Sequence, residues 1–120
     1  MSFALKRVYE EAAPADGYRV LVDRLWPRGV SKEAARLDAW LRDEAPSDEL
    51  RRRFHEGELT WGEFRRAYLA ELKDQREGLR PLAERARGQK VTLLFARADP
   101  ARNNAVVLKQ YLERLGRRRA

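Results

Sequence analysis

Residues 90–96 read Lys-Val-Thr-Leu-Leu-Phe-Ala, and this short apolar stretch decides the fold. Its density of apolar and β-branched residues is typical of a strand that is buried on both faces. Asp99 and Pro100 follow, a pair that can cap and begin a helix, and apolar residues then recur at helical spacing as far as Leu115. A buried strand that leads into an amphipathic helix predicts an α/β domain, with a small parallel or mixed β-sheet covered by helices.

Two further strands are expected near the start of the chain. Residues 3–9 alternate loosely between apolar and polar, and residues 18–23, Tyr-Arg-Val-Leu-Val-Asp, are rich in β-formers. The loop Arg24–Gly29 must end the second strand, because Pro27 has no amide donor and Gly29 favours a turn.

The middle of the chain predicts helices. Ser31 caps a helix that we expect to continue through Leu41 and to fade at Ala45. Ser47 caps another, which a break at Gly57 ends. The expected order of elements is therefore two strands, several helices, the buried strand and a last helix.

Two more helices are expected before the buried strand. Thr60 and Glu63 have the spacing of a capping box, and the helix that they begin fades near Gly78. Pro81 then opens a short helix, which Gly88 stops.

Length and composition predict one domain over residues 1–120. Of the 120 residues 43% are hydrophobic, enough for a single core. The absence of cysteine excludes disulfides and suits a reducing compartment. No apolar run approaches the roughly 20 residues that span a bilayer, so we expect a cytoplasmic protein without membrane contact.

The charge balance favours anionic partners. Lysine and arginine together number 26 against 19 acidic residues, a formal net charge of +7. Such a surface attracts anionic small molecules, nucleotides or nucleic acid. Residues 117–120 include three arginines and are expected to form a frayed basic tail.

Four stretches carry a resemblance to a known family: Lys6-Arg-Val-Tyr9, residues 16–29, Ala45-Pro-Ser47, and Val91–Ala96 followed by Asn103-Asn-Ala105. Together they resemble the YeaO-like bacterial proteins, catalogued as domain of unknown function number 488. The resemblance covers nearly the whole chain, and the run Val-Asp-Arg-Leu-Trp-Pro-Arg-Gly is its most specific part. It implies a compact α/β fold and a bacterial cytoplasmic setting, and it transfers no established activity.

Two departures from the family pattern concern histidine. The family tends to have one a few residues after the phenylalanine of the Ala-Pro-Ser helix, and another just before the Asn-Asn-Ala run. Here His55 directly follows Phe54, and Arg102 stands at the second position. A histidine-dependent mechanism is therefore not expected, and His55 is given no catalytic role.

Asp23 and Asp99 are the candidate catalytic residues, because each should follow a strand. If those strands are parallel neighbours, both carboxylates lie at the carboxyl edge of the sheet, where open α/β sheets bind ligands. Either could act as a general base or hold a magnesium ion. The simpler alternative is that Asp23 pairs with Arg24 and that Asp99 only caps a helix.

Five residues are candidates for ligand binding. Arg24 and Arg28 can each offer a planar pair of donors to a phosphate or carboxylate. Trp26 could stack on a ring or simply fill the core, and Asn103 and Asn104 could orient a ligand near a helix N-terminus.

No motif predicts a cofactor or a metal site. The chain has no Walker-type glycine loop, no Gly-x-Gly-x-x-Gly, no Gly-x-Ser-x-Gly and only one histidine. Three hypotheses stay open: a small enzyme acting on a phosphate-bearing or other anionic ligand, a nonenzymatic nucleic-acid-binding module, and an interaction protein or homodimer.

Overall fold

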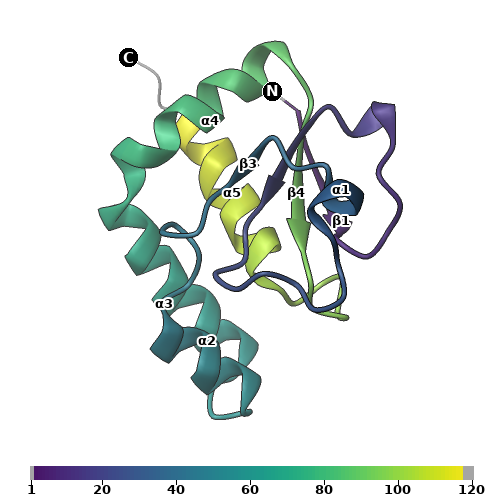
Figure 1. Ribbon diagram of the computed structural model, residues 1–120. Helices are drawn as coiled ribbons and strands as arrows, with labels where there is room; N and C mark the ends of the chain where they lie inside the picture. The colour runs from purple at the N-terminus through teal and green to yellow at the C-terminus, as the bar shows by residue number, and fades with distance from the viewer. Residues whose placement is uncertain (1, 118–120) are drawn as a thin grey trace.

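A parallel β-sheet forms the centre of the computed structural model, which describes residues 2–117 (Figure 1). Its four strands are β1 (Phe3–Arg7), β2 (Tyr18–Leu21), β3 (Ala39–Trp40) and β4 (Val91–Phe95). Their spatial order is β1-β4-β2-β3, and every pairing is parallel. The predicted α/β fold is confirmed, and the sheet is parallel rather than mixed.

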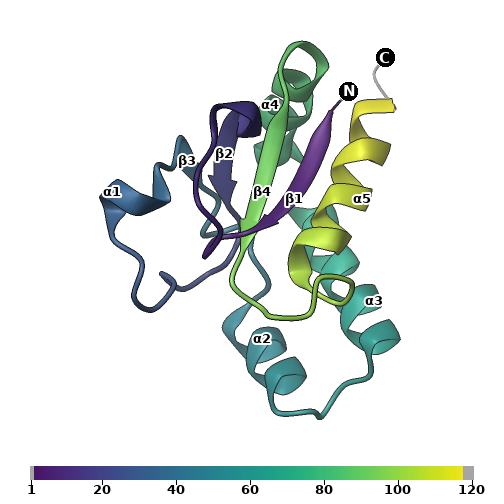
Figure 2. The ribbon, with the colours of Figure 1, turned by 90° about the vertical axis from the view of Figure 1, so that its right-hand side faces the viewer.

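Helices surround this sheet unevenly. They are α1 (Lys32–Ala35), α2 (Asp48–His55), α3 (Trp61–Asp74), α4 (Arg76–Gly88) and α5 (Asn104–Arg117), with a 3-10 turn at Pro14–Asp16. Figure 2 shows α3, α4 and α5 on one side of the sheet, and α2 beyond the carboxyl ends of the strands. Within residues 2–117, no helix combines the length and hydropathy that crossing a membrane requires.

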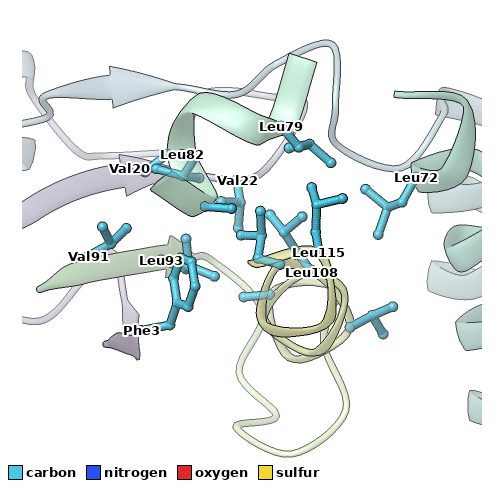
Figure 3. Packing of buried hydrophobic residues seen from close by; sticks show 14 of the residues in the cluster. Phe3, Val20, Val22, Leu72, Leu79, Leu82, Val91, Leu93, Leu108 and Leu115 are labelled. Carbon is cyan, nitrogen blue, oxygen red and sulfur yellow. The ribbon is translucent and has the colours of Figure 1, made fainter. Parts of the chain in front are cut away.

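The main core lies between the sheet and helices α3, α4 and α5. Val20, Val91 and Leu93 face Leu79 of α4 and Leu108 of α5, and all five are fully buried (Figure 3). Because side chains alternate along a strand, only one side of each strand contributes to this core. The central position of β4 explains why all five of its residues are buried, as its sequence predicts.

A smaller core covers the opposite face of the sheet. It consists of the buried Val8, Leu21 and Leu94, against which the half-buried Trp26 and Leu37 pack. This face is covered mainly by the loop after β2 and by the short helix α1. The loop after β2, which carries Arg24, Trp26 and Arg28, therefore also contributes to the packing of the fold.

Two predicted helix starts are confirmed by their caps. The Ser47 hydroxyl accepts the Leu50 N–H at 3.2 Å, and α2 begins there. Thr60 and Glu63 form a reciprocal capping box, with hydrogen bonds of 3.1 and 2.8 Å. Each cap pairs a backbone N–H that the helix leaves without an intrahelical acceptor.

The helix predicted from Ser31 to Leu41 is wrong beyond Ala35. The Arg19 guanidinium donates to the Ala35 carbonyl from Nε at 3.1 Å and from Nη2 at 2.8 Å, which satisfies the end of a one-turn helix. The Asp38 carboxylate then accepts the Arg19 N–H at 2.8 Å. These contacts hold the chain beside β2, so that Ala39 and Trp40 pair with it as strand β3.

The boundary predicted between two helices near Gly78 and Pro81 is also wrong. Helix α3 ends at Asp74, and α4 runs from Arg76 with Pro81 inside it. A proline in a helix removes one hydrogen bond, but here packing outweighs that loss, because Leu79 is fully buried in the main core.

The last helix begins later than its sequence predicts. Helix α5 starts at Asn104 rather than at Pro100, and the Asn103 side chain accepts the Val106 N–H at 3.1 Å. At the other end Arg117 is the last residue of α5. The rest of the predicted basic tail, residues 118–120, lies outside the described residues.

Candidate functional site

Asp23 connects three elements at the carboxyl edge of the sheet. It follows β2, and its Oδ2 accepts the backbone N–H of Ala96, just after β4, at 2.9 Å. Its Oδ1 accepts the side-chain amide of Asn104, the first residue of α5, also at 2.9 Å. The same amide donates to the Val22 carbonyl at 2.9 Å. Asp23 and Asn104 thus fasten β2, β4 and α5 together.

The electrostatics of Asp23 follow from this position. Burial raises the pKa of the Asp23 carboxyl, and the hydrogen bonds from Asn104 and Ala96 oppose that shift only in part. The N–H groups that both oxygens accept favour the charged form, so they make the carboxylate a weaker proton acceptor than burial alone would.

Asp99 and Asn103 form a separate, self-contained turn. The Asp99 Oδ1 accepts the N–H groups of Ala101 at 2.9 Å and Arg102 at 3.1 Å, and these bonds, that of Ala101 first, hold the pKa of Asp99 below its usual range. The buried Asn103 donates from Nδ2 to the Asp99 carbonyl at 2.9 Å. Both residues order the start of α5.

Arg24 braces the segment that leads into α2. Its Nε donates to the Pro46 carbonyl at 2.9 Å, and its Nη2 donates to the Ala45 carbonyl at 3.3 Å. These bonds hold the N-terminal end of α2 against the loop after β2. Two of the five N–H donors of Arg24 are therefore used within the protein.

Trp26 and Trp40 pack edge to face, with their ring centroids 5.5 Å apart. The Trp26 indole donates to the Val30 carbonyl at 2.7 Å, and the Trp40 indole donates to the Asp23 carbonyl at 2.6 Å. These bonds hold the Trp26 ring within the loop after β2 and the Trp40 ring of β3 against that loop. One edge of Trp26 is thereby held within the protein, while the residue contributes to the cavity described next.

A cavity of about 450 Å³ opens at this edge, and we call it the edge cavity. It lies between the loop after β2, the loop after β4 and helix α2. Its charged and titratable lining residues are Tyr9, Asp23, Arg24, Arg28, Arg51, His55 and Arg97. Four arginines thus face one carboxylate, and apolar side chains, among them Trp26, Phe54 and Phe64, make up much of the remaining wall.

The side chains of the other three arginines make no hydrogen bond within residues 2–117. The Arg28 side chain is exposed, and no described residue bonds to it or pairs with it. Arg97 lies with its guanidinium 4.3 Å from the Phe54 ring centroid and makes no salt bridge within residues 2–117, although it interacts electrostatically with the Asp99 carboxylate. Arg51 has only Asp48, at 3.8 Å, which is beyond hydrogen-bonding distance.

An aromatic column supports the wall that α2 contributes. Phe54 stacks on Phe64 with 4.2 Å between ring centroids, and Trp61 and Tyr68 continue the column along α3 at 5.8 and 5.9 Å from Phe64. The Tyr68 hydroxyl donates to the Glu44 carbonyl at 2.9 Å. This packing makes the α2 side of the edge cavity a fixed surface.

The structure brings together five of the seven residues predicted from the sequence, since the edge cavity is lined by Asp23, Arg24, Trp26, Arg28 and Asn104. Asp99 and Asn103 do not line it. Sequence reasoning missed Arg51 and Arg97, and it set aside His55, which lines the cavity. Arg97 could have been found, because it directly follows the buried strand and the alanine that binds Asp23.

The sequence leaves open whether Asp23 or Asp99 holds a magnesium ion. Within residues 2–117, no three or more histidine, aspartate or glutamate side chains lie close enough together to hold a metal ion. The carboxylate that lines the edge cavity, Asp23, has N–H donors on both oxygens.

Fold and site together define a class: a small parallel α/β protein with an arginine-rich cavity at the carboxyl edge of its sheet. The chain belongs to the family described as the inactive DUF488-N3 subclade, whose sequence model matches residues 2–120. This confirms the resemblance carried by the loop after β2.

Relatives in two bacteria show the same membership. The chain is 44% identical to the uncharacterised protein YeaO of Escherichia coli K12 over 115 residues, which are 96% of this chain and 100% of the relative. It is 42% identical to the uncharacterised protein Rv3073c of Mycobacterium tuberculosis H37Rv over 106 residues, 88% of this chain and 89% of the relative. No solved structure matches the chain.

Proposed function

We propose that this protein binds a small organic anion in the edge cavity and does not convert it. The observation that carries the proposal is the charge of the lining, four arginines against one aspartate. The volume and the largely apolar wall suit a small molecule, because ligand cavities of roughly 300–1,000 Å³ combine apolar surface with a few fixed polar groups. Guanidinium groups suit carboxylates and phosphates.

Binding without conversion is favoured over catalysis by the arrangement of the carboxylates. Asp23 has both oxygens occupied, and Asp99 lies in the turn before α5, outside the lining of the edge cavity. Of the two groups proposed for proton transfer, only Asp23 therefore lies beside the ligand. The description of the matching subclade as inactive supports the same choice.

A thermal-shift screen tests this function. The probes are sugar phosphates, nucleoside monophosphates, dicarboxylates and short DNA and RNA, each at low and high salt. A ligand that binds only the folded state raises the melting temperature, and we expect this from a small anion at both salt concentrations. Arg28→Gln should lose the shift. Arg114→Gln, on an exposed residue of α5 away from the cavity, should keep it.

Other outcomes select other functions. If only DNA or RNA raises the melting temperature, and high salt abolishes the effect, the net charge of +7 serves nucleic-acid binding. That result would overturn the proposal. If the ligand still raises the melting temperature of Arg28→Gln, the ligand binds somewhere other than the edge cavity. Mass spectrometry of the incubated ligand separates binding from catalysis, because a product would restore the enzymatic alternative.

A further inference from the structure

Arg51 has the one buried side-chain nitrogen or oxygen in residues 2–117 that lacks a hydrogen-bond partner, its Nε. The residue lies on α2 and lines the edge cavity. A buried donor without an acceptor is unfavourable and rare in folded proteins, so its presence calls for a cause. A ligand oxygen in the cavity would supply the missing acceptor once a turn of the Arg51 side chain uncovers the Nε.

The surroundings of Arg51 leave it available for such a ligand. Its nearest carboxylate, Asp48, is 67% exposed and lies 3.8 Å from Nη2, a weakly held surface pair. The side chain as a whole is 41% exposed, although its Nε is covered, so solvent reaches other parts of the side chain.

Two more cations complete the surroundings, each from a different segment. Arg97, from the loop after β4, is held over the Phe54 ring, which limits the freedom that it would lose on binding. Arg28, from the loop after β2, is unpaired within the described chain. Three guanidinium groups with little internal neutralisation favour a ligand group that carries two negative charges and several oxygens.

Building on the proposed function, we propose that Arg51 is the anchor of the edge cavity and that the ligand is an organic phosphate monoester. The Arg51 side chain turns on binding, so that its covered Nε edge meets two of the phosphate oxygens. Its dianion balances the charges of Arg28 and Arg97, and the organic part lies against the apolar wall near Trp26. A guanidinium presents Nε and a terminal nitrogen as two parallel donors, which a lysine ammonium does not reproduce.

Calorimetric titration of the purified full chain at pH 7.5 and constant ionic strength tests this proposal. The probes are phenyl phosphate, benzenesulfonate and inorganic phosphate, which separate the dianion from the ring. Phenyl phosphate should bind most tightly, because it alone carries both features. Arg51→Lys should weaken it roughly ten-fold, the loss expected for one charge-assisted bond, whereas Arg52→Lys, its exposed neighbour outside the cavity lining, should not.

A second variant tests the role of Arg51 from the opposite direction. Asp48→Asn removes the carboxylate near the guanidinium, and it should tighten phenyl phosphate binding about two-fold to three-fold. This result does not depend on whether Arg51→Lys folds.

Several results would overturn the inference. Equal affinities for benzenesulfonate and phenyl phosphate would show that the protein does not recognise the second negative charge of the phosphate. An unchanged affinity in Arg51→Lys, together with a loss in Arg28→Gln, would leave the anion-binding function standing and dismiss Arg51 as its anchor. If none of the probes binds and no anion in the thermal screen does, both proposals fail together.

Discussion

Arg19 and Arg51 show two opposite uses of a partly or fully buried guanidinium. Arg19 is only 4% exposed, and it bonds to the Asp16 carboxylate and twice to the Ala35 carbonyl. The buried Nε of Arg51 bonds to nothing in the described chain. The contrast separates a charge that the fold consumes from a charge that the fold leaves for a partner.

The aspartates divide in the same way. Burial works to raise the pKa of Asp16, but hydrogen bonds from the Ala13 N–H, Lys6 and Arg19 outweigh it and hold that pKa below its usual range. At Asp23 the donors are neutral amides, and burial raises the pKa. The cationic partners are thus concentrated on Asp16, away from the edge cavity.

The largest expected effect is the loss of the carboxylate of Asp16. Asp16→Ala leaves Arg19 buried and Lys6 largely buried without a counter-charge, so the free energy of unfolding should fall by about 3–5 kcal/mol. Urea denaturation of the two proteins measures the difference.

Glu77→Ala is the matched control for this change. Glu77 and Arg80 are also three residues apart, but both side chains are exposed, and the pair should be worth about 0–1 kcal/mol. Equal losses in the two variants would refute the idea that the fold consumes the charge of Arg19.

Asp23→Asn should have the next largest effect. An amide can accept through one of its two terminal atoms only, so either the Ala96 N–H or the Asn104 amide loses its acceptor, at a cost of about 1–3 kcal/mol. Asp99→Asn provides the control, because there a single oxygen accepts both N–H groups. Urea unfolding of both variants should show a loss for Asp23 and a change within about 0.5 kcal/mol for Asp99.

The Asp23 comparison should also depend on pH. Because folding raises the pKa of Asp23, the folded state binds this proton more readily than the unfolded state does. The stability that protonation of Asp23 contributes is fully present below the pKa of this group in the unfolded state. It is lost as the pH rises through the pKa of the group in the folded state. The gap between wild type and Asp23→Asn should therefore widen as the pH falls through the raised pKa, and a gap that narrows would contradict this assignment.

Much of the fold could be predicted because its signals are local. The buried strand β4 and the caps at Ser47 and Thr60 depend on residues within a few positions of one another. Strand β3 and the interior position of Pro81 depend instead on distant partners. The Arg19 side chain ends α1, and burial of the α4 face holds a helix that the proline alone would interrupt.

The candidate site divides along the same line. Asp23, Trp26 and Arg28 come from one loop whose composition marks it, and the structure places all three around the edge cavity. Arg51 belongs to a run of arginines that looks like a solvated helix face. Its place at the cavity follows from Arg24, which binds carbonyl groups 21 and 22 residues further along the chain. Helical spacing alone carries no sign of that contact.

Of the three changes that are compared with a control, Arg97→Gln should have the smallest effect on stability, and it should have a clear effect on binding. Arg97 lies over Phe54 at 4.3 Å and Arg42 lies over Trp40 at 5.5 Å, both exposed, but only Arg97 lines the edge cavity. Loss of either exposed cation–π contact should cost about 0.5–1 kcal/mol in urea unfolding. In calorimetric titration with phenyl phosphate, Arg97→Gln should bind more weakly and Arg42→Gln should match wild type. Equal affinities in the two variants would place Arg97 among the residues that serve the fold, as Arg19 does, because a cation that faces the ligand cannot be removed without loss of its attraction.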